Sequence, residues 1–209
     1  MFTGIVTAIG TIQSVEQRGD LRAVIACPFD PAKVDIGASI ACSGVCLTVV
    51  AKSGTIGSMT FAVDISGETV SRTAPGMWSE GGKLNLEPSL RLGDELGGHI
   101  VTGHVDAVGT LTDLRPDGGS TRLTITAPAE LAPFIAAKGS ITVNGVSLTV
   151  NTVSDQPDGS VQFGLNIIPH TAEVTTLGDL RQGDGVNLEI DTIARYLQRM
   201  QALRAGAGA

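Results

Sequence analysis

The chain has 209 residues and a formal net charge of −7, and hydrophobic residues make up 42% of it. That length fits one large or two small domains, and the 3% of aromatic residues requires a core built mainly from aliphatic side chains. Because the negative charge opposes binding to nucleic acid and no apolar run approaches the ~20 residues of a membrane-spanning helix, we expect neither a nucleic-acid nor a membrane partner.

The chain contains two copies of one sequence pattern, about 100 residues apart. The matches, first copy and then second, are TGIVTAIGT (3–11) with TGHVDAVGT (102–110), GVCLTV (44–49) with GVSLTV (145–150), and NLE (85–87) with NLE (187–189). Three matches in the same order predict two tandem domains, residues 1–94 and 95–190. They meet in the Gly-rich stretch 92–98.

Each copy has the sequence pattern of short β-strands. Residues 39–50 mix β-branched and small side chains, and residues 121–126 alternate with the period of two that marks a strand. Turn sequences such as PDGG at 116–119 and QPDG at 156–159 separate such runs. This spacing leaves room for about six strands in each copy, and short strands favour a small closed barrel without exposed sheet edges.

Helical patterns occur in two places. Residues 129–137 form a predicted short helix in the second copy, and residues 191–205 form a predicted C-terminal helix with Asp191 or Thr192 as N-cap. The apolar face of the C-terminal helix carries Ile193, Leu197, Met200 and Leu203. Because an isolated helix of this length is marginal in water, it must pack on its own barrel or on another subunit. We expect residues 206–209 to be disordered.

Differences between the two copies indicate functional residues, since the shared fold explains what the copies have in common. Cys46 corresponds to Ser147, and His104 corresponds to Ile5. An imidazole in place of an apolar side chain needs a pocket or a hydrogen-bond partner, so we interpret His104 as functional. Cys46 fits either an inert buried side chain or a nucleophile, and the pattern leaves both open.

The cysteines and histidines form neither a disulfide nor a metal pattern. Three cysteines are an odd number and make no disulfide framework, which, with no signal peptide, predicts a cytoplasmic protein. Neither Cys42 and Cys46 nor His99 and His104 have the spacing of structural zinc ligands, so we expect no metal. No phosphate-binding loop surrounds Gly98. Hydroxyl groups that recur in both copies suit a polar heterocycle at a barrel mouth: Ser39, Thr48, Ser140 and Thr149.

Several sequence strings, in this order, resemble the riboflavin synthase family over essentially the full chain. They are MFTGIV at 1–6, GVCLTV at 44–49, GGHIVTGHV at 97–105, GVSLTV at 145–150 and TTLG at 175–178. The resemblance implies an all-β fold of two tandem six-stranded antiparallel barrels, Greek-key-like, followed by the C-terminal helix. It also implies a homotrimer held partly by these helices. Each catalytic site would lie between the first barrel of one subunit and the second barrel of its neighbour.

The reaction that the resemblance implies joins two molecules of one substrate. One 6,7-dimethyl-8-ribityllumazine gives a four-carbon unit to another, which yields riboflavin and 5-amino-6-ribitylamino-2,4-pyrimidinedione. A proton leaves the 7-methyl group of one ring and a nucleophile adds to the other, and this chemistry needs no cofactor. Two rings held face to face react as an intramolecular pair, which accounts for two related but unequal pockets.

Matching positions give single residues their expected roles. Ser39 and Cys46 would act as nucleophile or polarising groups, and His104 would transfer the proton. Substrate contacts are expected from Phe2, Thr3, Gly4, Thr48, Asp64, Thr69, Val105, Lys138, Asn144, Ser147, Thr149, Ile168 and Thr171. The chain departs from the family at Asn144, where aspartate is frequent, and at His170, where glutamate is frequent. No carboxylate can therefore act at these two positions.

Three other functions remain open from the sequence. A lumazine protein of the same fold binds a lumazine or a flavin without turnover, but the thiol of Cys46 and the imidazole of His104 favour an enzyme. A structural module without a ligand would have no need of unequal pockets. A flavin-dependent reductase on a related barrel would carry its coloured cofactor through purification.

Overall fold

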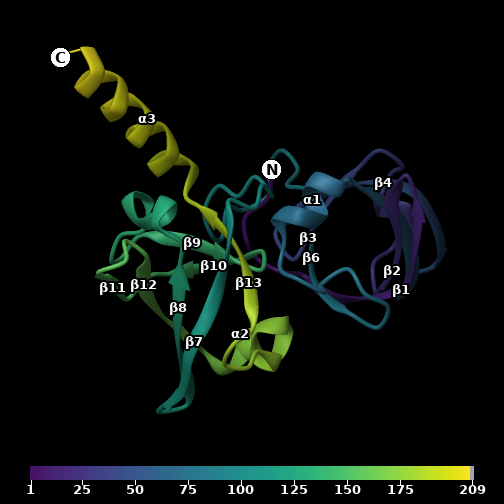
Figure 1. Ribbon diagram of the computed structural model, residues 1–209. Helices are drawn as coiled ribbons and strands as arrows, with labels where there is room; N and C mark the ends of the chain where they lie inside the picture. The colour runs from purple at the N-terminus through teal and green to yellow at the C-terminus, as the bar shows by residue number, and fades with distance from the viewer. Residues whose placement is uncertain (208–209) are drawn as a thin grey trace.

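The first copy folds into a closed antiparallel barrel in a computed structural model that describes residues 1–207 (Figure 1). Neighbouring strands follow the order β1-β2-β5-β4-β3-β6, and β6 pairs with β1 to close the barrel. The strands are β1 (Ala8–Arg18), β2 (Asp20–Cys27), β3 (Ser39–Cys42), β4 (Val45–Thr55), β5 (Ser58–Ile65) and β6 (Lys83–Pro88). The predicted six-stranded barrel is therefore confirmed for this copy.

The second copy repeats this arrangement with one strand divided in two. Its seven strands form a curled antiparallel sheet in the order β10-β9-β13-β7-β8-β12-β11. The strands are β7 (Ala107–Asp117), β8 (Ser120–Ala127), β9 (Ser140–Val143), β10 (Val146–Thr149), β11 (Thr152–Asp155), β12 (Val161–Ile167) and β13 (Gly185–Ile190). The predicted fold class is confirmed, with seven strands in place of the expected six in this copy.

The division falls where the first copy is also irregular. In β4 the pairing with β5 shifts between Val49 and Ala51, which inserts an extra residue and bends the strand. The corresponding residues 150 and 151 lie between β10 and β11. The first strand of each copy also carries a bulge, at matching positions. These bends curve each sheet around its core.

Each sheet encloses its own aliphatic core. A phenylalanine lies in each, Phe61 in the first and Phe163 in the second, and Val, Ile and Leu supply most other buried side chains. Along β4, Leu47 is buried and Thr48 is exposed, because successive side chains of a strand point to opposite faces. Cys46 therefore lies on the outer face with Thr48.

The short helices differ from the prediction. The segment expected as a helix over 129–137 is a 3-10 helix, Ala129–Phe134, that contains Pro133. Proline lacks the N–H that continues a helix, which explains the short length. Two α-helices were not predicted, α1 (Gly67–Arg72) and α2 (Pro169–Val174), although a serine N-cap precedes α1 and a proline begins α2. Two further 3-10 helices are Pro31–Lys33 and Thr176–Asp179.

The C-terminal helix α3 (Thr192–Ala207) extends away from both barrels (Figure 1). Asp191 caps its first turn, and Arg195 forms a 2.8 Å ion pair with Asp106. The helix includes the first two residues of the tail expected to be disordered, and residues 208–209 lie outside the described residues. Within the part of the chain that the structure describes, no helix has both the length and the apolar character to cross a membrane.

The two copies are joined by an exchange of the segments that precede their first strands. The carbonyl of Gly103, in the second copy, accepts the N–H of Cys46 in the first at 2.8 Å. In the reciprocal contact, the carbonyl of Gly4 accepts the N–H of Ser147, also at 2.8 Å. A short antiparallel bridge joins the two segments themselves. Each copy therefore extends the hydrogen bonding of a strand in the other.

The asparagine of the repeated NLE string ties the copies together. The side-chain amide of Asn85 donates to the carbonyl of Asn144 at 2.8 Å, and that of Asn187 donates to the carbonyl of Ser43 at 2.9 Å. Each amide oxygen accepts a backbone N–H from the opposite copy at 2.7 Å. One residue type at equivalent positions therefore satisfies buried backbone groups on both sides.

The glutamate of the same string holds the exchanged segment. Glu87 accepts the N–H and the hydroxyl of Thr3 at 2.7 and 2.8 Å, and the N–H of Gly4 at 2.9 Å. Glu189 makes the equivalent three bonds to Thr102 and Gly103 and also accepts the N–H of His104, at 2.6 to 3.0 Å. Burial raises the pKa of Glu87, and the N–H groups of the segment lower it in partial compensation. The repeated NLE string is thus explained by two distinct anchoring tasks.

Replacing Gly4 with alanine tests the exchange against a matched glycine. Gly4 and Gly19 have φ of 76° and 87°, which disfavour any residue with a Cβ. A Cβ at Gly4 would lie 2.7 Å from the Ser147 nitrogen, whereas nothing lies within 4 Å at Gly19. We expect Gly19→Ala to lower the free energy of unfolding by about 1 kcal/mol and Gly4→Ala by at least about twice that. Equal losses in urea denaturation would contradict this role of the exchange.

Candidate active site

A cavity of about 210 Å³ lies on the outer face of the first barrel, next to the exchanged segment of the second copy. Its walls come from β4, from α1 and from that segment. The lining residues are Val45, Cys46, Glu68, Thr69, Arg72, Thr73, Gly103, His104 and Val105. Four residues expected from the sequence, Cys46, Thr69, His104 and Val105, are therefore brought together in what we call the Cys46 cavity.

Cys46 is the one of the three cysteines that lines this cavity. It is half-buried, whereas Cys27 and Cys42 are buried in the barrel core. Burial raises the pKa of both core thiols, so they remain protonated. Cys46 is therefore the thiol that a ligand in the cavity can reach.

His104 is held by its main chain, and within residues 1–207 its ring has no hydrogen-bond partner. Its N–H donates to Oε2 of Glu189 at 3.0 Å, and the residue is exposed at the edge of the Cys46 cavity. The cavity thus combines a thiol with an imidazole.

Phe2 packs in the apolar cluster that adjoins Cys46. It is 1% exposed and packs in a small apolar cluster with Ala41 and Val101, against which Cys46 also packs. Its backbone N and O atoms bridge to Val101 at 2.7 and 3.0 Å. The structure therefore places Phe2 behind the thiol and not among the cavity-lining residues.

Ser39 and Thr48 lie further along the same outer face. They face each other across β3 and β4, as Ala41 and Cys46 do two pairs away. Side chains directly opposite on paired strands project to the same side. Ser39 lines a separate cavity of about 160 Å³, and Thr48 is exposed. The structure therefore brings neither hydroxyl into the Cys46 cavity.

Asp64, on β5, forms an ion pair with Arg22 on the neighbouring strand β2. Arg22 donates to its two carboxylate oxygens at 2.8 and 2.7 Å. These hydrogen bonds lower the pKa of the Asp64 carboxyl, so it is ionised at neutral pH. Asp64 is not among the residues that line the Cys46 cavity.

The second copy has a different polar group at the equivalent place on β10. The hydroxyl oxygen of Ser147 lies 2.7 Å from Nδ1 of His99, and Nε2 of the same ring lies 3.2 Å from the hydroxyl oxygen of Thr142. Thr142 is the residue opposite Ser147 on β9. Burial lowers the pKa of His99 and outweighs the opposing charges of Asp191 and Glu189, so the ring is neutral at neutral pH.

The sequence did not identify His99 as a site residue. It precedes the repeated string at 102–110, where comparison of the copies offers no counterpart. Among the described residues, no group of three or more His, Cys, Asp or Glu side chains is placed to hold a metal ion. Only the contacts of His99 in the folded chain reveal it.

Three of the remaining expected contacts lie on the surface of the second copy. Thr149 is exposed on the same side of β10 as Ser147. Ile168 immediately precedes α2 and is exposed, and Thr171 lies within α2. Of these three, Thr171 corresponds to a residue that lines the Cys46 cavity, Thr69, whereas Thr149 and Ile168 correspond to Thr48 and Ser66, which do not.

Two other expected contacts lie in tight turns. Lys138 and Asn144 have φ of 67° and 47°, the left-handed region that non-glycine residues seldom adopt. The side-chain oxygen of Asn144 accepts the N–H of Asn187 at 2.8 Å. Asn144 therefore has a structural task at the contact between the copies.

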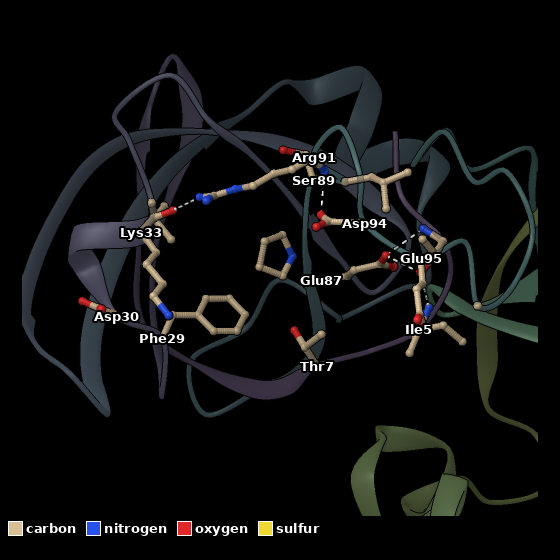
Figure 2. Close-up of a pocket in the computed structure, with 15 residues that line it drawn as sticks. Ile5, Thr7, Phe29, Asp30, Lys33, Glu87, Ser89, Arg91, Asp94 and Glu95 are labelled. Carbon is tan, nitrogen blue, oxygen red and sulfur yellow. Dashed lines mark hydrogen bonds between the residues drawn. The ribbon is translucent and has the colours of Figure 1, made fainter.

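A larger cavity of about 470 Å³ lies where the first barrel meets the linker between the copies (Figure 2). Thr3 is the one expected site residue that lines it. Phe29 and Pro88 give it apolar walls, and Arg91 reaches across one side to donate to the carbonyl of Lys33 at 2.7 Å. This cavity contains neither the thiol nor the imidazole of the Cys46 cavity.

Known proteins resemble the chain over nearly its whole length. The profile of the lumazine binding domain matches residues 3–89 and again residues 102–191. The riboflavin synthase of Brucella abortus (strain 2308) is 46% identical over 96% of this chain and 98% of the relative. The riboflavin synthases of Mycobacterium tuberculosis (strain H37Rv) and Photobacterium phosphoreum are 42% and 41% identical, over 96% of this chain and 98% and 88% of theirs.

Solved structures agree with this similarity. The crystal structure of LumP complexed with riboflavin superposes with a TM-score of 0.77 at 28% identity, covering 91% of this chain and 99% of LumP. LumP complexed with 6,7-dimethyl-8-(1'-D-ribityl) lumazine gives a TM-score of 0.74 at 26% identity, with the same coverage. The chain belongs to the riboflavin synthase family, with two lumazine binding domains in tandem.

Proposed function

We propose that this chain converts two molecules of 6,7-dimethyl-8-ribityllumazine into riboflavin and 5-amino-6-ribitylamino-2,4-pyrimidinedione by transfer of a four-carbon unit. The observation that carries the proposal is the Cys46 cavity, where a reachable thiol and an exposed imidazole meet at the contact of two unequal copies. All atoms of the two substrate molecules are found in the two products, so the reaction consumes no oxidant or reductant.

His104 and Cys46 have different roles in the proposed reaction. His104 takes a proton from the 7-methyl group of one lumazine and returns a proton later in the reaction. Cys46 adds to, or polarises, the ring of the lumazine in the first pocket. Ser147 and Thr149, at the matching place in the second copy, contact the other lumazine. Holding both rings together removes most of the entropic cost of their encounter.

A binding protein without turnover is the second candidate. LumP has the same fold and was solved with riboflavin and with a lumazine. The enzyme is favoured because this chain has both the thiol and the imidazole in one cavity and is 46% identical to a riboflavin synthase, against 28% to LumP.

The apolar face of α3 supports a homotrimer. Ile193, Tyr196, Leu197, Met200 and Leu203 are all more than half exposed, and they follow one side of the helix. A helix of this kind gains stability when a partner covers its apolar stripe. In the trimer the first pocket of one subunit would face the second pocket of its neighbour. Three unpaired cysteines suit a reducing cytoplasm, which we propose as the location.

Turnover of the proposed substrate is the direct test. We expect the purified chain, without added metal or cofactor, to form one riboflavin for every two molecules of 6,7-dimethyl-8-ribityllumazine consumed. Absorbance spectra follow both compounds. Tight binding without riboflavin formation would move the chain to the lumazine-protein class.

Variants of the Cys46 cavity separate chemistry from binding. We expect Cys46→Ser and His104→Ala each to lower kcat at least about 100-fold while changing Kd for the lumazine less than about threefold. Cys27→Ala, which alters a thiol in the core, serves as the control and should retain kcat. If kcat and binding fall together in the two cavity variants, these residues only shape the pocket.

Charge on the helix face tests the trimer. We expect the double variant Leu197→Glu, Met200→Glu to sediment as a monomer and to lose turnover, because buried charges oppose helix contact. Gln198→Glu, off the apolar stripe, should remain a trimer. Unchanged sedimentation of the double variant would refute this role for α3.

A further inference from the structure

The first turns of α3 are bound to the segment that carries His104. Asp106 lies two residues after His104, and its two carboxylate oxygens accept the guanidinium of Arg195 at 2.8 and 2.9 Å. The same carboxylate accepts the N–H of Ile190, the last residue of β13, at 2.9 Å. The side chain of Asp106 is only 14% exposed. One half-enclosed carboxylate therefore joins the end of β13, the start of α3 and the segment of His104.

The main chain of this segment is also fixed to β13. The N–H of His104 donates to Glu189 at 3.0 Å, and the N–H of Asp106 donates to the carbonyl of Leu188 at 2.8 Å. The described residues offer the ring of His104 no hydrogen-bond partner, so its place depends on this backbone. A change in the direction of α3 would reach the same backbone through Asp106.

The first copy lacks the carboxylate at this position. Thr7 corresponds to Asp106, and its N–H donates to the carbonyl of Leu86 at 2.9 Å, as the N–H of Asp106 does to Leu188. The hydroxyl of Thr7 donates to the same carbonyl at 3.2 Å. The strand that follows in the pairing, β6, leads into the linker, whereas β13 leads into α3. The carboxylate is thus present in the copy that a long helix follows.

We propose that Arg195 is a positioning residue that, through Asp106, fixes the direction of α3 relative to the segment of His104. A guanidinium that meets both oxygens of a carboxylate sets an orientation as well as a distance. The apolar stripe of α3 then provides the association of subunits, and the ion pair ensures that assembled subunits hold His104 in place beside Cys46. The trimer and the reaction rest on the proposed function, whereas the coupling of Arg195 to His104 does not.

Removing the charge of Arg195 separates orientation from association. We expect Arg195→Met to sediment as a trimer and to change Kd for 6,7-dimethyl-8-ribityllumazine less than about threefold, while kcat falls about tenfold because His104 is misplaced. Arg195→Lys, which keeps the positive charge, should recover part of kcat. Arg199→Met, the same change one helical turn further along α3, is the matched control and should retain kcat.

The partner residue gives a second, independent variant. In Asp106→Asn the amide oxygen can still accept the N–H of Ile190, but the charge that holds Arg195 is gone. We expect the same loss of kcat as in Arg195→Met. The double variant should lose no more than either single one, because the two side chains act as a pair.

The place of His104 can be followed without turnover. The chain has three histidines, so a ¹³C-histidine-labelled sample gives few ring signals in NMR spectra, and His104→Ala identifies the one of interest. We expect Arg195→Met to shift the signal of His104 and to leave that of His170 in place. Arg199→Met should shift neither.

Three results would overturn the proposal. They are an unchanged kcat in a trimeric Arg195→Met variant, a monomeric Arg195→Met variant, which would make the ion pair necessary for association itself, and an unmoved signal of His104. An unsubstituted chain that does not convert the lumazine would refute the proposed function instead, and the signal of His104 would still decide whether Arg195 controls its place.

Discussion

Two buried carboxylates organise the centre of this molecule. Glu87 and Glu189 each hold the main chain of the segment that precedes the first strand of their own copy, by bonds to N–H and hydroxyl groups of 2.6 to 3.0 Å. A buried carboxylate is stable only when such donors surround it. Once the segments are held, the carbonyl groups of Gly4 and Gly103 point at the opposite copy and can complete its strands.

The pockets follow from this arrangement. The segment held by Glu189 brings His104 beside Cys46, so a residue of the second copy becomes part of the wall of the first pocket. The reciprocal segment brings Gly4 beside Ser147. The backbone contacts are alike on both sides, and the side chains are not. A similar backbone frame therefore holds a thiol beside an imidazole in the first copy, and a serine beside a histidine in the second.

Much of the fold could be predicted from the sequence because the repeat is strong. Matching strings placed the two copies, and the spacing of turn sequences predicted about six strands in each, which is the number found in the first. The break between β10 and β11, at residues 150 and 151, was not predicted, although Asn151, a residue type depleted in strands, stands where the first copy has Val50. The six-residue helices were missed because segments so short carry no hydrophobic period.

The site was predicted in part. Comparison of the copies identified Cys46 and His104, which the structure places in one cavity, because each differs from its counterpart in the ability to do chemistry. It could not identify His99, which has no counterpart. It also gave no indication that Asp64 is engaged by Arg22, because that ion pair joins strands far apart in sequence.

The reciprocal exchange has a consequence for how such a protein can change over generations. In an assembly of two identical single-copy chains, every substitution would appear twice, once in each half. A gene that encodes both halves in one chain removes that restriction, because a change at Ser147 leaves Cys46 untouched. The same Asn and Glu residues are present in both halves. Each Asn bonds the main chain of the other half, and each Glu holds the segment that contacts the other half. Joining both halves in one chain thus allows residues such as Cys46 and Ser147 to differ, while the residues at the contact between the copies stay alike.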